Sequence, residues 1–241
     1  MLLSHRINQA TLNFTKKIFL KFLAAIFITI YSGVLTNHDQ KFYQLITTPK
    51  ELPAEIQLNV PFTPQAPFGI WDADHNEACE EAALVMVNAY LDNEKLTPES
   101  ADTQILRLIG WEELNGYKVD VDAREMGQLA NDYLYKNYKI YYDDQVTENR
   151  IKTLLNKGYP VILPVAGQTL GNPYFRGEGP PYHVIVLIGY NETNFITHDP
   201  GTRNGESYEY SIDTIMNSIH DWTGNKQTIK EGRKAMLIMT P

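Results

Sequence analysis

The sequence has a single cysteine, Cys79, among its 241 residues. One cysteine excludes an intramolecular disulfide, so the hydrophobic core must hold the fold together. The sequence also lacks a glycine-rich phosphate loop and internal repeats, which excludes the common nucleotide-binding motifs and repeat architectures. Basic residues are fewer than acidic ones, 21 against 29, and this balance argues against nucleic acid as a partner.

The N-terminal segment differs from the rest of the chain in charge and hydropathy. Residues 1–35 contain four basic residues and no acidic one, and an apolar run interrupted by Lys21 extends over residues 18–35. This pattern is typical of a cleaved export signal or a retained membrane anchor, and the length of the run fits either. Basic residues before the run predict that the rest of the chain lies outside the cytoplasm, secreted or attached to the membrane.

The remaining residues divide into a linker and one domain. Residues 36–55 are mixed and polar and contain Pro49 and Pro53, which predicts a linker. Residues 56–241 have a length that suits a single well-packed domain. Residues 36–241 together hold 17 basic and 29 acidic residues, a net charge of −12.

The first half of the domain has helical patterns and the second half has strand patterns. Helices are expected over residues 77–91 with Asn76 as N-cap, from residue 98 towards 108, over residues 122–134, and after Thr147. Apolar, β-branched runs predict strands at residues 160–165, 182–190, 194–198 and 235–239. Helices followed by strands indicate an α+β domain with an antiparallel sheet.

Cys79 stands at the start of the first predicted helix. Unpaired backbone N–H groups and the helix dipole favour a thiolate there. Glu77, Glu80 and Glu81 oppose it, so a reactive Cys79 needs a cationic partner, normally an imidazolium. The alternative is a buried cysteine that acts as a small hydrophobic residue.

His183 and Asp199 are the candidate partners of this thiol. His183 opens the most hydrophobic strand, directly after a loop rich in glycine and proline, and Asp199 closes the next strand. An antiparallel pairing of the two strands would bring the two residues together, and the acid could then orient the imidazole. The alternative for His183 is a core histidine bonded to backbone. The alternative for Asp199 is a turn residue before Pro200 and Gly201.

Two loops supply further candidates. Gln65 lies on a proline-rich loop before Cys79, and its amide could donate to a developing oxyanion. Trp71 on the same loop, and the loop that precedes His183, are expected to contact substrate. The residues expected to bind substrate are Trp71, Tyr174, Phe175 and Tyr182. The alternative for the second loop is an ordered surface loop whose aromatic side chains pack on the domain.

The remaining polar motifs point to weaker candidates. His75 is close to Cys79 in sequence and could replace His183 as the base, whereas His198 alternates to the other strand face. Asp72, Asp74 and Asn76 have the spacing of a calcium loop, but its required glycine and final glutamate are missing. No metal and no cofactor is therefore expected.

Five segments together resemble the C39-like peptidases, papain-fold cysteine enzymes related to the domains that remove leader peptides from bacteriocins. These segments are Leu58–Gln65, Ala78–Met86, Gly158–Ile162, His183–Tyr190 and His198–Thr202. The resemblance covers about residues 56–239. It implies an α+β papain-like fold in which an N-terminal helical half packs on a C-terminal antiparallel sheet.

The same resemblance implies a role for each candidate residue. Cys79 would be the nucleophile, His183 the general base, Asp199 the orienting acid and Gln65 the oxyanion donor. Many members of the family have Cys-Gly-Pro where this sequence has Cys79, Glu80 and Glu81.

The sequence therefore predicts an exported or membrane-anchored cysteine peptidase that acts on a peptide or protein substrate. An amidase or acyltransferase could use the same thiol. A papain-like binding module without turnover is the other alternative, and Glu80 and Glu81 favour it. The oligomeric state remains open.

Overall fold

The structure, a computed structural model, describes residues 52–241. The predicted signal or anchor over residues 1–35, its possible membrane attachment through residues 18–35, and most of the predicted linker lie outside the described residues. Within residues 52–241, no helix is both long enough and apolar enough to cross a membrane.

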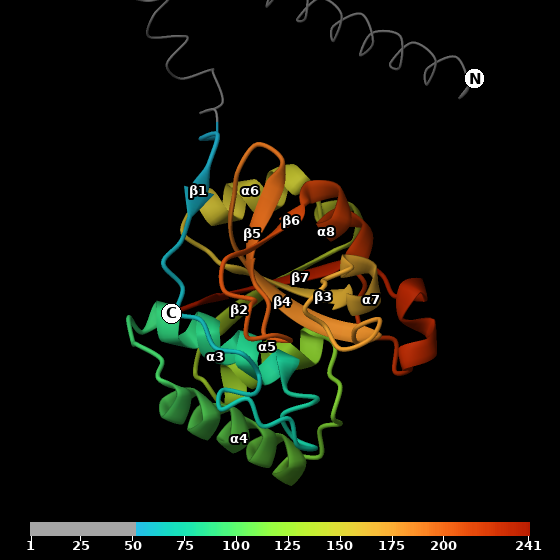
Figure 1. The fold of residues 1–241 in the computed structure, drawn as a ribbon. Helices are drawn as coiled ribbons and strands as arrows, with labels where there is room; N and C mark the ends of the chain where they lie inside the picture. Colours follow the sequence, from blue (N-terminus) through green and yellow to red (C-terminus); the bar gives the residue numbers. More distant parts are fainter. Residues whose placement is uncertain (1–51) are drawn as a thin grey trace, which may run out of the picture. The chain divides into compact units, whose positions relative to one another are not determined.

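An antiparallel sheet forms the centre of the described part (Figure 1). Its strands are β1 (Ile56–Gln57), β2 (Asn137–Tyr142), β3 (Val161–Ala166), β4 (Tyr182–Tyr190), β5 (Asn194–His198), β6 (Tyr208–Ser211) and β7 (Ala235–Thr240). The strand order is β2-β7-β3-β4-β5-β6, and β1 also pairs with β4. The central position of β4 explains its continuous apolar sequence, because all nine of its residues are buried.

Helices connect and cover the strands. The α-helices are α3 (Cys79–Leu91), α4 (Pro98–Leu114), α5 (Ala123–Asp132), α6 (Glu148–Asn156), α7 (Gly167–Leu170) and α8 (Ile212–Ser218). Two short 3-10 helices are η1 (Asp143–Gln145) and η2 (Lys226–Glu231). Thr97 and Asp122 close capping boxes at the starts of α4 and α5, which explains why these helices begin where the sequence pattern predicts.

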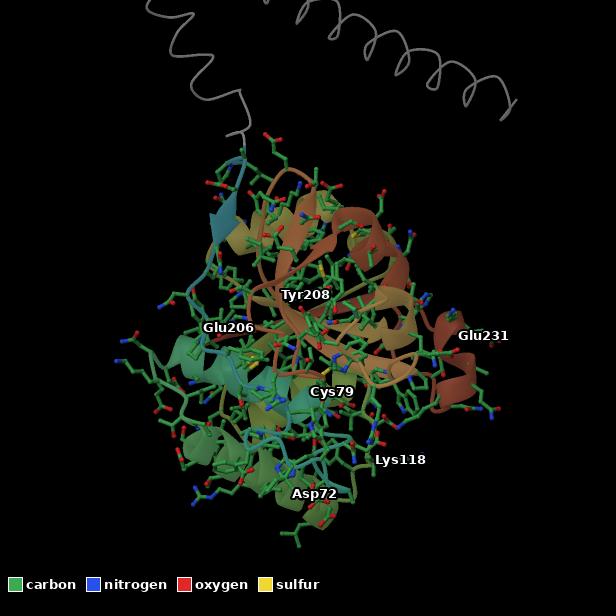
Figure 2. All side chains as sticks on the ribbon, viewed as in Figure 1. Asp72, Cys79, Lys118, Glu206, Tyr208 and Glu231 are labelled. Carbon is green, nitrogen blue, oxygen red and sulfur yellow. The ribbon has the colours of Figure 1, made fainter. Side chains whose placement is uncertain are left out.

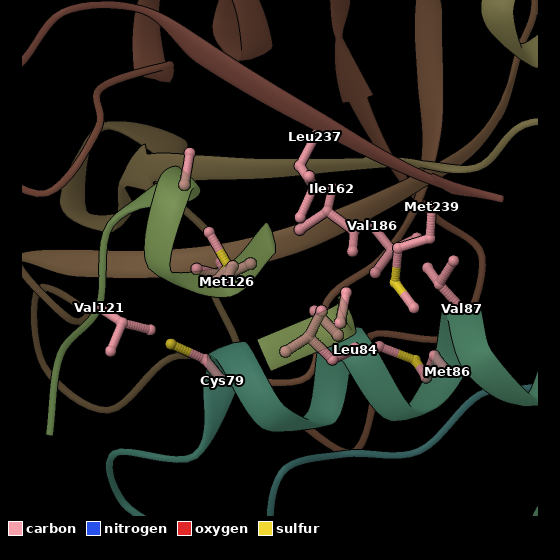
Figure 3. Close-up of a cluster of buried hydrophobic side chains, with 14 of the residues drawn as sticks. Cys79, Leu84, Met86, Val87, Val121, Met126, Ile162, Val186, Leu237 and Met239 are labelled. Carbon is pink, nitrogen blue, oxygen red and sulfur yellow. The ribbon is translucent and has the colours of Figure 1, made fainter. Parts of the chain in front are cut away.

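The two faces of the sheet belong to separate hydrophobic clusters. On one face Ile162, Val184 and Val186 pack against side chains of α3 and α5 (Figure 3). On the other face Leu163 and Ile185 pack in a cluster that includes residues of α6 and α8. This alternation follows the period of two along each strand, so β3 and β4 are buried from both sides.

The fold agrees with the predicted α+β class and antiparallel sheet, with additions that the pattern did not show. Strands β2 and β6 and helix α8 were not predicted, and helices cover both faces of the sheet. Helix α3 begins at Cys79, two residues later than expected. Asn76 is not its N-cap, because the Asn76 amide instead donates to the carbonyl oxygens of Trp71 and Asp72.

Candidate active site

Cys79 is the first residue of α3 and lines a cavity of about 830 Å³. The N-cap residue is Ala78, which offers no side-chain acceptor, so no side chain caps the first turn. Backbone N–H groups there can therefore serve a ligand that carries negative charge. Figure 2 shows Cys79 among the side chains between α3 and the sheet, and only 6% of the residue is exposed.

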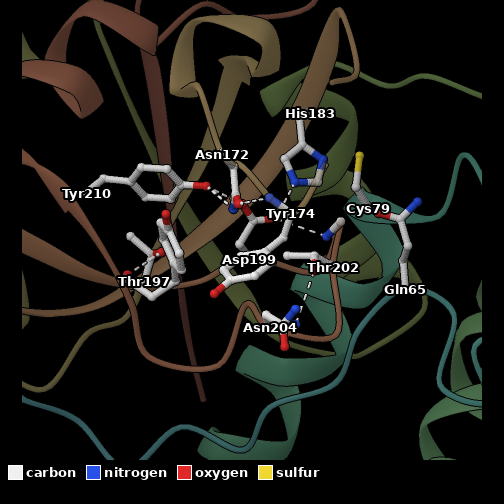
Figure 4. A network of polar contacts seen from close by, with 12 residues as sticks. Gln65, Cys79, Asn172, Tyr174, His183, Thr197, Asp199, Thr202, Asn204 and Tyr210 are labelled. Atoms are coloured by element: carbon white, nitrogen blue, oxygen red, sulfur yellow. Dashed lines mark hydrogen bonds and ion pairs between the residues drawn. The ribbon is translucent and has the colours of Figure 1, made fainter. Parts of the chain in front are cut away.

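His183 and Asp199 meet through the pairing of β4 with β5. Val186 lies opposite His198, so Asp199, the residue after β5, reaches the end of β4 where His183 lies. His183 Nε2 and Asp199 Oδ1 are 2.8 Å apart, and both side chains are buried. In Figure 4 the imidazole lies between Asp199 and Cys79, with its second nitrogen, Nδ1, directed toward the cysteine sulfur.

The Asp199 carboxylate is fully paired. Its Oδ1 also accepts from Gly201 N at 3.0 Å, and its Oδ2 accepts from Tyr210 Oη at 2.6 Å and Asn172 Nδ2 at 3.2 Å. Burial alone would raise the pKa of Asp199, but the charge and hydrogen bond of His183, with the other donors, hold it below its usual value. An ionised Asp199 can therefore orient the imidazole and stabilise its charged form.

Sequence reasoning missed Asn172 and Tyr210 as part of this site. Tyr210 lies on β6, opposite Phe195 of β5, and this strand was not predicted. Asn172 follows Gly171, which has a positive φ of 62° at the C-cap of α7, and this turn aims the Asn172 amide at Asp199. Had the pairing of β5 with β6 been predicted, it would have placed Tyr210 next to β5 and so near Asp199.

The Cys79 thiol has an acidic partner. It donates to Glu80 Oε2 at 2.9 Å, and no hydrogen bond joins it to His183 within residues 52–241. Burial, then the charge of Glu80, then the hydrogen bond to Glu80 and the charge of Glu81, raise the pKa of Cys79 well above its usual value. The backbone N–H of Val184 acts in the opposite direction. Burial and the neighbouring carboxyl groups therefore disfavour the thiolate in this arrangement.

Gln65 lies beside the same cavity but has a structural hydrogen bond. Its backbone N–H donates to Pro200 O at 2.9 Å, which ties the proline-rich loop to the segment after Asp199. Its side-chain Nε2 donates to His75 O at 2.8 Å, and Oε1 is buried without a partner. Because an amide nitrogen carries two hydrogens, one N–H of Gln65 remains for another acceptor.

A model of the Peptidase_C39 like family matches residues 57–229. The chain belongs to this family. None of the curated proteins matches the chain. Among solved structures, a Bacillus anthracis protein classed as a C39-like peptidase is similar at 15% identity and a TM-score of 0.53, with 78% of this chain and 99% of that chain covered. The predicted α+β fold and the predicted family are confirmed.

Two cysteine proteases also align with this C39-like domain, at lower scores. CMS1MS2 of Carica candamarcensis is 12% identical, with 78% of this chain and 98% of that chain covered and a TM-score of 0.39. Xylellain of Xylella fastidiosa is 13% identical, with 79% of this chain and 87% of that chain covered and the same TM-score.

The four residues predicted to bind substrate all line the cavity of the C39-like domain. Trp71 and Tyr174 are 39% and 55% exposed, so their rings are available to a bound molecule. Phe175 packs edge-on against the His183 ring at 5.5 Å between centroids, and Tyr182 Oη donates to Val121 O at 2.8 Å. Phe175 and Tyr182 therefore form fixed walls of the cavity.

The other histidines considered as candidates have structural partners. His75 contacts Asp72 at 2.7 Å and Asp102 at 3.0 Å through its two ring nitrogens. His198 is buried between Val60 O and the backbone N–H of Ser207, and burial lowers its pKa. No group of His, Cys, Asp or Glu within residues 52–241 has the arrangement of a metal site.

A buried acidic cluster lies next to Cys79 in the C39-like domain. Glu81 of α3 and Glu112 of α4 are both buried, and each carboxyl group affects the pKa of the other. Burial raises the pKa of Glu112 to about 7, and burial with the charge of Glu112 raises the pKa of Glu81 well above its usual value. Two adjacent carboxyl groups without a cation can remain buried only if at least one is protonated.

This cluster predicts a domain that is less stable at alkaline pH. Because the pKa of Glu112 is higher in the folded than in the unfolded state, its stabilising contribution is complete below about pH 4.5 and is lost as pH rises through 7. Replacing Glu112 with Gln should remove on the order of 2 kcal/mol of the stability loss between pH 5 and pH 8. Urea unfolding at both pH values measures this change in the free energy of unfolding. Glu113→Gln, which replaces an exposed neighbour, is the control. An equal loss of stability between pH 5 and pH 8 in the native protein, Glu112→Gln and Glu113→Gln would contradict this account.

Proposed function

We propose that the domain hydrolyses peptide bonds with Cys79 as nucleophile, His183 as general base and Asp199 as the acid that orients His183. One observation carries the proposal: a single cavity is lined by the lone cysteine, at an uncapped helix start, and by a histidine paired with a buried carboxylate. The family match supports this reaction, because the family is named for peptidases.

The proposed reaction transfers protons through His183. Nδ1 takes the proton of the Cys79 thiol, and the resulting thiolate attacks the carbonyl carbon of the scissile bond. The oxyanion accepts hydrogen bonds from the Cys79 backbone N–H and the second N–H of Gln65. The imidazolium then gives its proton to the leaving amine as the C–N bond breaks, which leaves an acyl enzyme. Water, deprotonated by His183, cleaves the thioester and restores the thiol.

The cavity suits a peptide or protein substrate. Its volume of about 830 Å³ exceeds what one amino-acid residue fills, and the exposed rings of Trp71 and Tyr174 offer apolar contacts.

We further propose that the enzyme acts outside the cytoplasm, as a secreted or membrane-anchored protein. The support is the sequence pattern of residues 1–35, in which basic residues precede an apolar run and acidic residues are absent.

A binding module without turnover remains a second candidate, and the Cys79–Glu80 hydrogen bond is the observation that favours it. A thiol held by a carboxylate in a buried site is a poor nucleophile unless that carboxylate changes its protonation. An acyltransferase differs from the peptidase only in the acceptor of the acyl group.

Covalent labelling distinguishes these candidates. The full chain is incubated with a peptide epoxide, and the modified residue is identified by mass spectrometry of the digested protein. A peptidase should be labelled at Cys79, and the His183→Ala variant should be labelled much more slowly. Absence of labelling together with absence of peptide cleavage would support the binding module. Peptide cleavage in the presence of an added amine then separates hydrolysis from transfer, because a transferase forms the amide.

A further inference from the structure

Glu80 contacts the reacting sulfur and has no cation to balance its charge. The residue is 0% exposed, its Oε2 accepts from Cys79 at 2.9 Å, and its Oε1 accepts from Val121 N at 3.2 Å. No ion pair within residues 52–241 includes Glu80. The nearby Lys226 pairs instead with Glu77 at 2.6 Å and Asp120 at 3.4 Å.

The titratable groups around Glu80 come from each element packed against it. Glu81 lies on α3, Glu112 on α4, Asp120 before α5, and Tyr182 and His183 on β4. His183 is the one of these groups that can carry positive charge, and its Nε2 pairs with Asp199. Burial and then the charge of Glu81 raise the pKa of Glu80 well above its usual value.

These surroundings exclude a thiolate beside an ionised Glu80. The two anions would lie 2.9 Å apart in a buried site, where like charges strongly oppose each other. A protonated Glu80 reverses the hydrogen bond without moving an atom: its Oε2–H donates to the thiolate, while Oε1 still accepts from Val121 N. The same contact can therefore hold either a thiol or a thiolate.

We propose that Glu80 is a further catalytic residue, protonated in the active enzyme, where it donates its hydrogen bond to the Cys79 thiolate. This inference rests on the proposed function. When Glu80 releases its proton to solvent, the imidazolium returns its Nδ1 proton to the sulfur. The site then holds a thiol, a neutral His183 and an ionised Glu80. The inactive form has one proton fewer, so the nucleophile is lost as pH rises.

Substitution by glutamine separates the hydrogen bond from the charge. In Glu80→Gln the amide oxygen can accept from Val121 N and the amide nitrogen can donate to the thiolate, but nothing at this position ionises. We expect this variant to keep a reactive Cys79 at alkaline pH, where the native enzyme loses it. Glu113→Gln, which removes an exposed acid far from the sulfur in sequence, is the matched control.

The readout is the rate of alkylation by iodoacetamide, which reports on Cys79 because the chain has no other cysteine. The full-chain proteins are followed from pH 4 to pH 9 by mass spectrometry. At pH 8, Glu80→Gln should react about tenfold faster than the native protein, and Glu113→Gln should match the native protein. An equal or slower rate in Glu80→Gln would overturn the proposal.

The native protein alone provides a second readout if the variant does not fold. Its alkylation rate should pass through a maximum and then decline with rising pH as Glu80 ionises. A rate that rises steadily with pH, as for a simple thiol, would overturn the proposal. If the native enzyme cleaves peptides and the alkylation rate of Glu80→Gln equals the native rate, only the proposed role of Glu80 is refuted. No reaction of Cys79 in any protein at any pH would refute the proposed function as well.

Discussion

Replacing Cys79 with alanine is expected to lower kcat/KM for peptide hydrolysis by about 10⁴-fold or more, because it removes the thiol that forms the acyl enzyme in the proposed reaction. The chain has no second cysteine to substitute for it. Some acceleration over water would persist from the cavity and the helix N-terminus, which still bind the substrate and its oxyanion. Initial rates on a cleaved peptide measure the effect.

The fold should survive this substitution, which makes the result interpretable. Alanine removes one small atom from a site next to an open cavity, and Glu80 loses a single hydrogen bond. The urea unfolding midpoint should therefore change little. A Cys79→Ala enzyme with more than about one per cent of the native rate would contradict the role of Cys79.

Replacing Asp199 with alanine is expected to lower both stability and rate. The carboxylate pairs with donors of four residues in a buried site, and its removal takes this acceptor from His183, Tyr210 and Asn172. The free energy of unfolding should fall by about 3 kcal/mol, the usual cost of breaking a buried charged pair. The rate should fall because the imidazole loses both its orientation and its counter-charge.

Asp199→Asn separates the two effects. Asparagine keeps the volume and one oxygen acceptor but removes the negative charge, so it should retain more stability than Asp199→Ala while losing a comparable part of kcat/KM. Thermal melts and steady-state kinetics of both variants measure this split. Equal rates in Asp199→Asn and the native enzyme would show that the charge has no part in catalysis.

Tyr210→Phe is the matched variant, because it removes one donor to Oδ2 and leaves the carboxylate in place. Its effects on stability and rate should be smaller than those of either Asp199 variant.

The sequence was informative where a local pattern determined the structure. The apolar runs of β4 and β5 predicted two neighbouring antiparallel strands, and this pairing brings His183 and Asp199 within hydrogen-bond distance. The helix after Cys79 was also predicted, because an apolar run that includes several good helix formers follows the cysteine.

The rest depends on tertiary contacts that local patterns do not encode. Helix α3 is buried on nearly all sides, so it lacks an amphipathic period. Its N-cap is Ala78 rather than Asn76. Tyr210 joins the site through the pairing of β6 with β5. Glu80 and Glu81 were expected to oppose the thiolate, and their charges do raise the pKa of Cys79. The sequence did not show that both side chains are buried, because glutamate is rarely buried.

The rate at which iodoacetamide alkylates Cys79 at pH 6, in the native protein, in urea and in His183→Ala, tests the central claim most directly. If the His183 imidazolium stabilises a thiolate in the cavity, the native protein should react faster than the unfolded chain, whose thiol is almost wholly protonated at this pH. His183→Ala should then react on the order of 100-fold more slowly than the native protein. A native rate below that of the unfolded chain, unchanged in His183→Ala, would contradict the account.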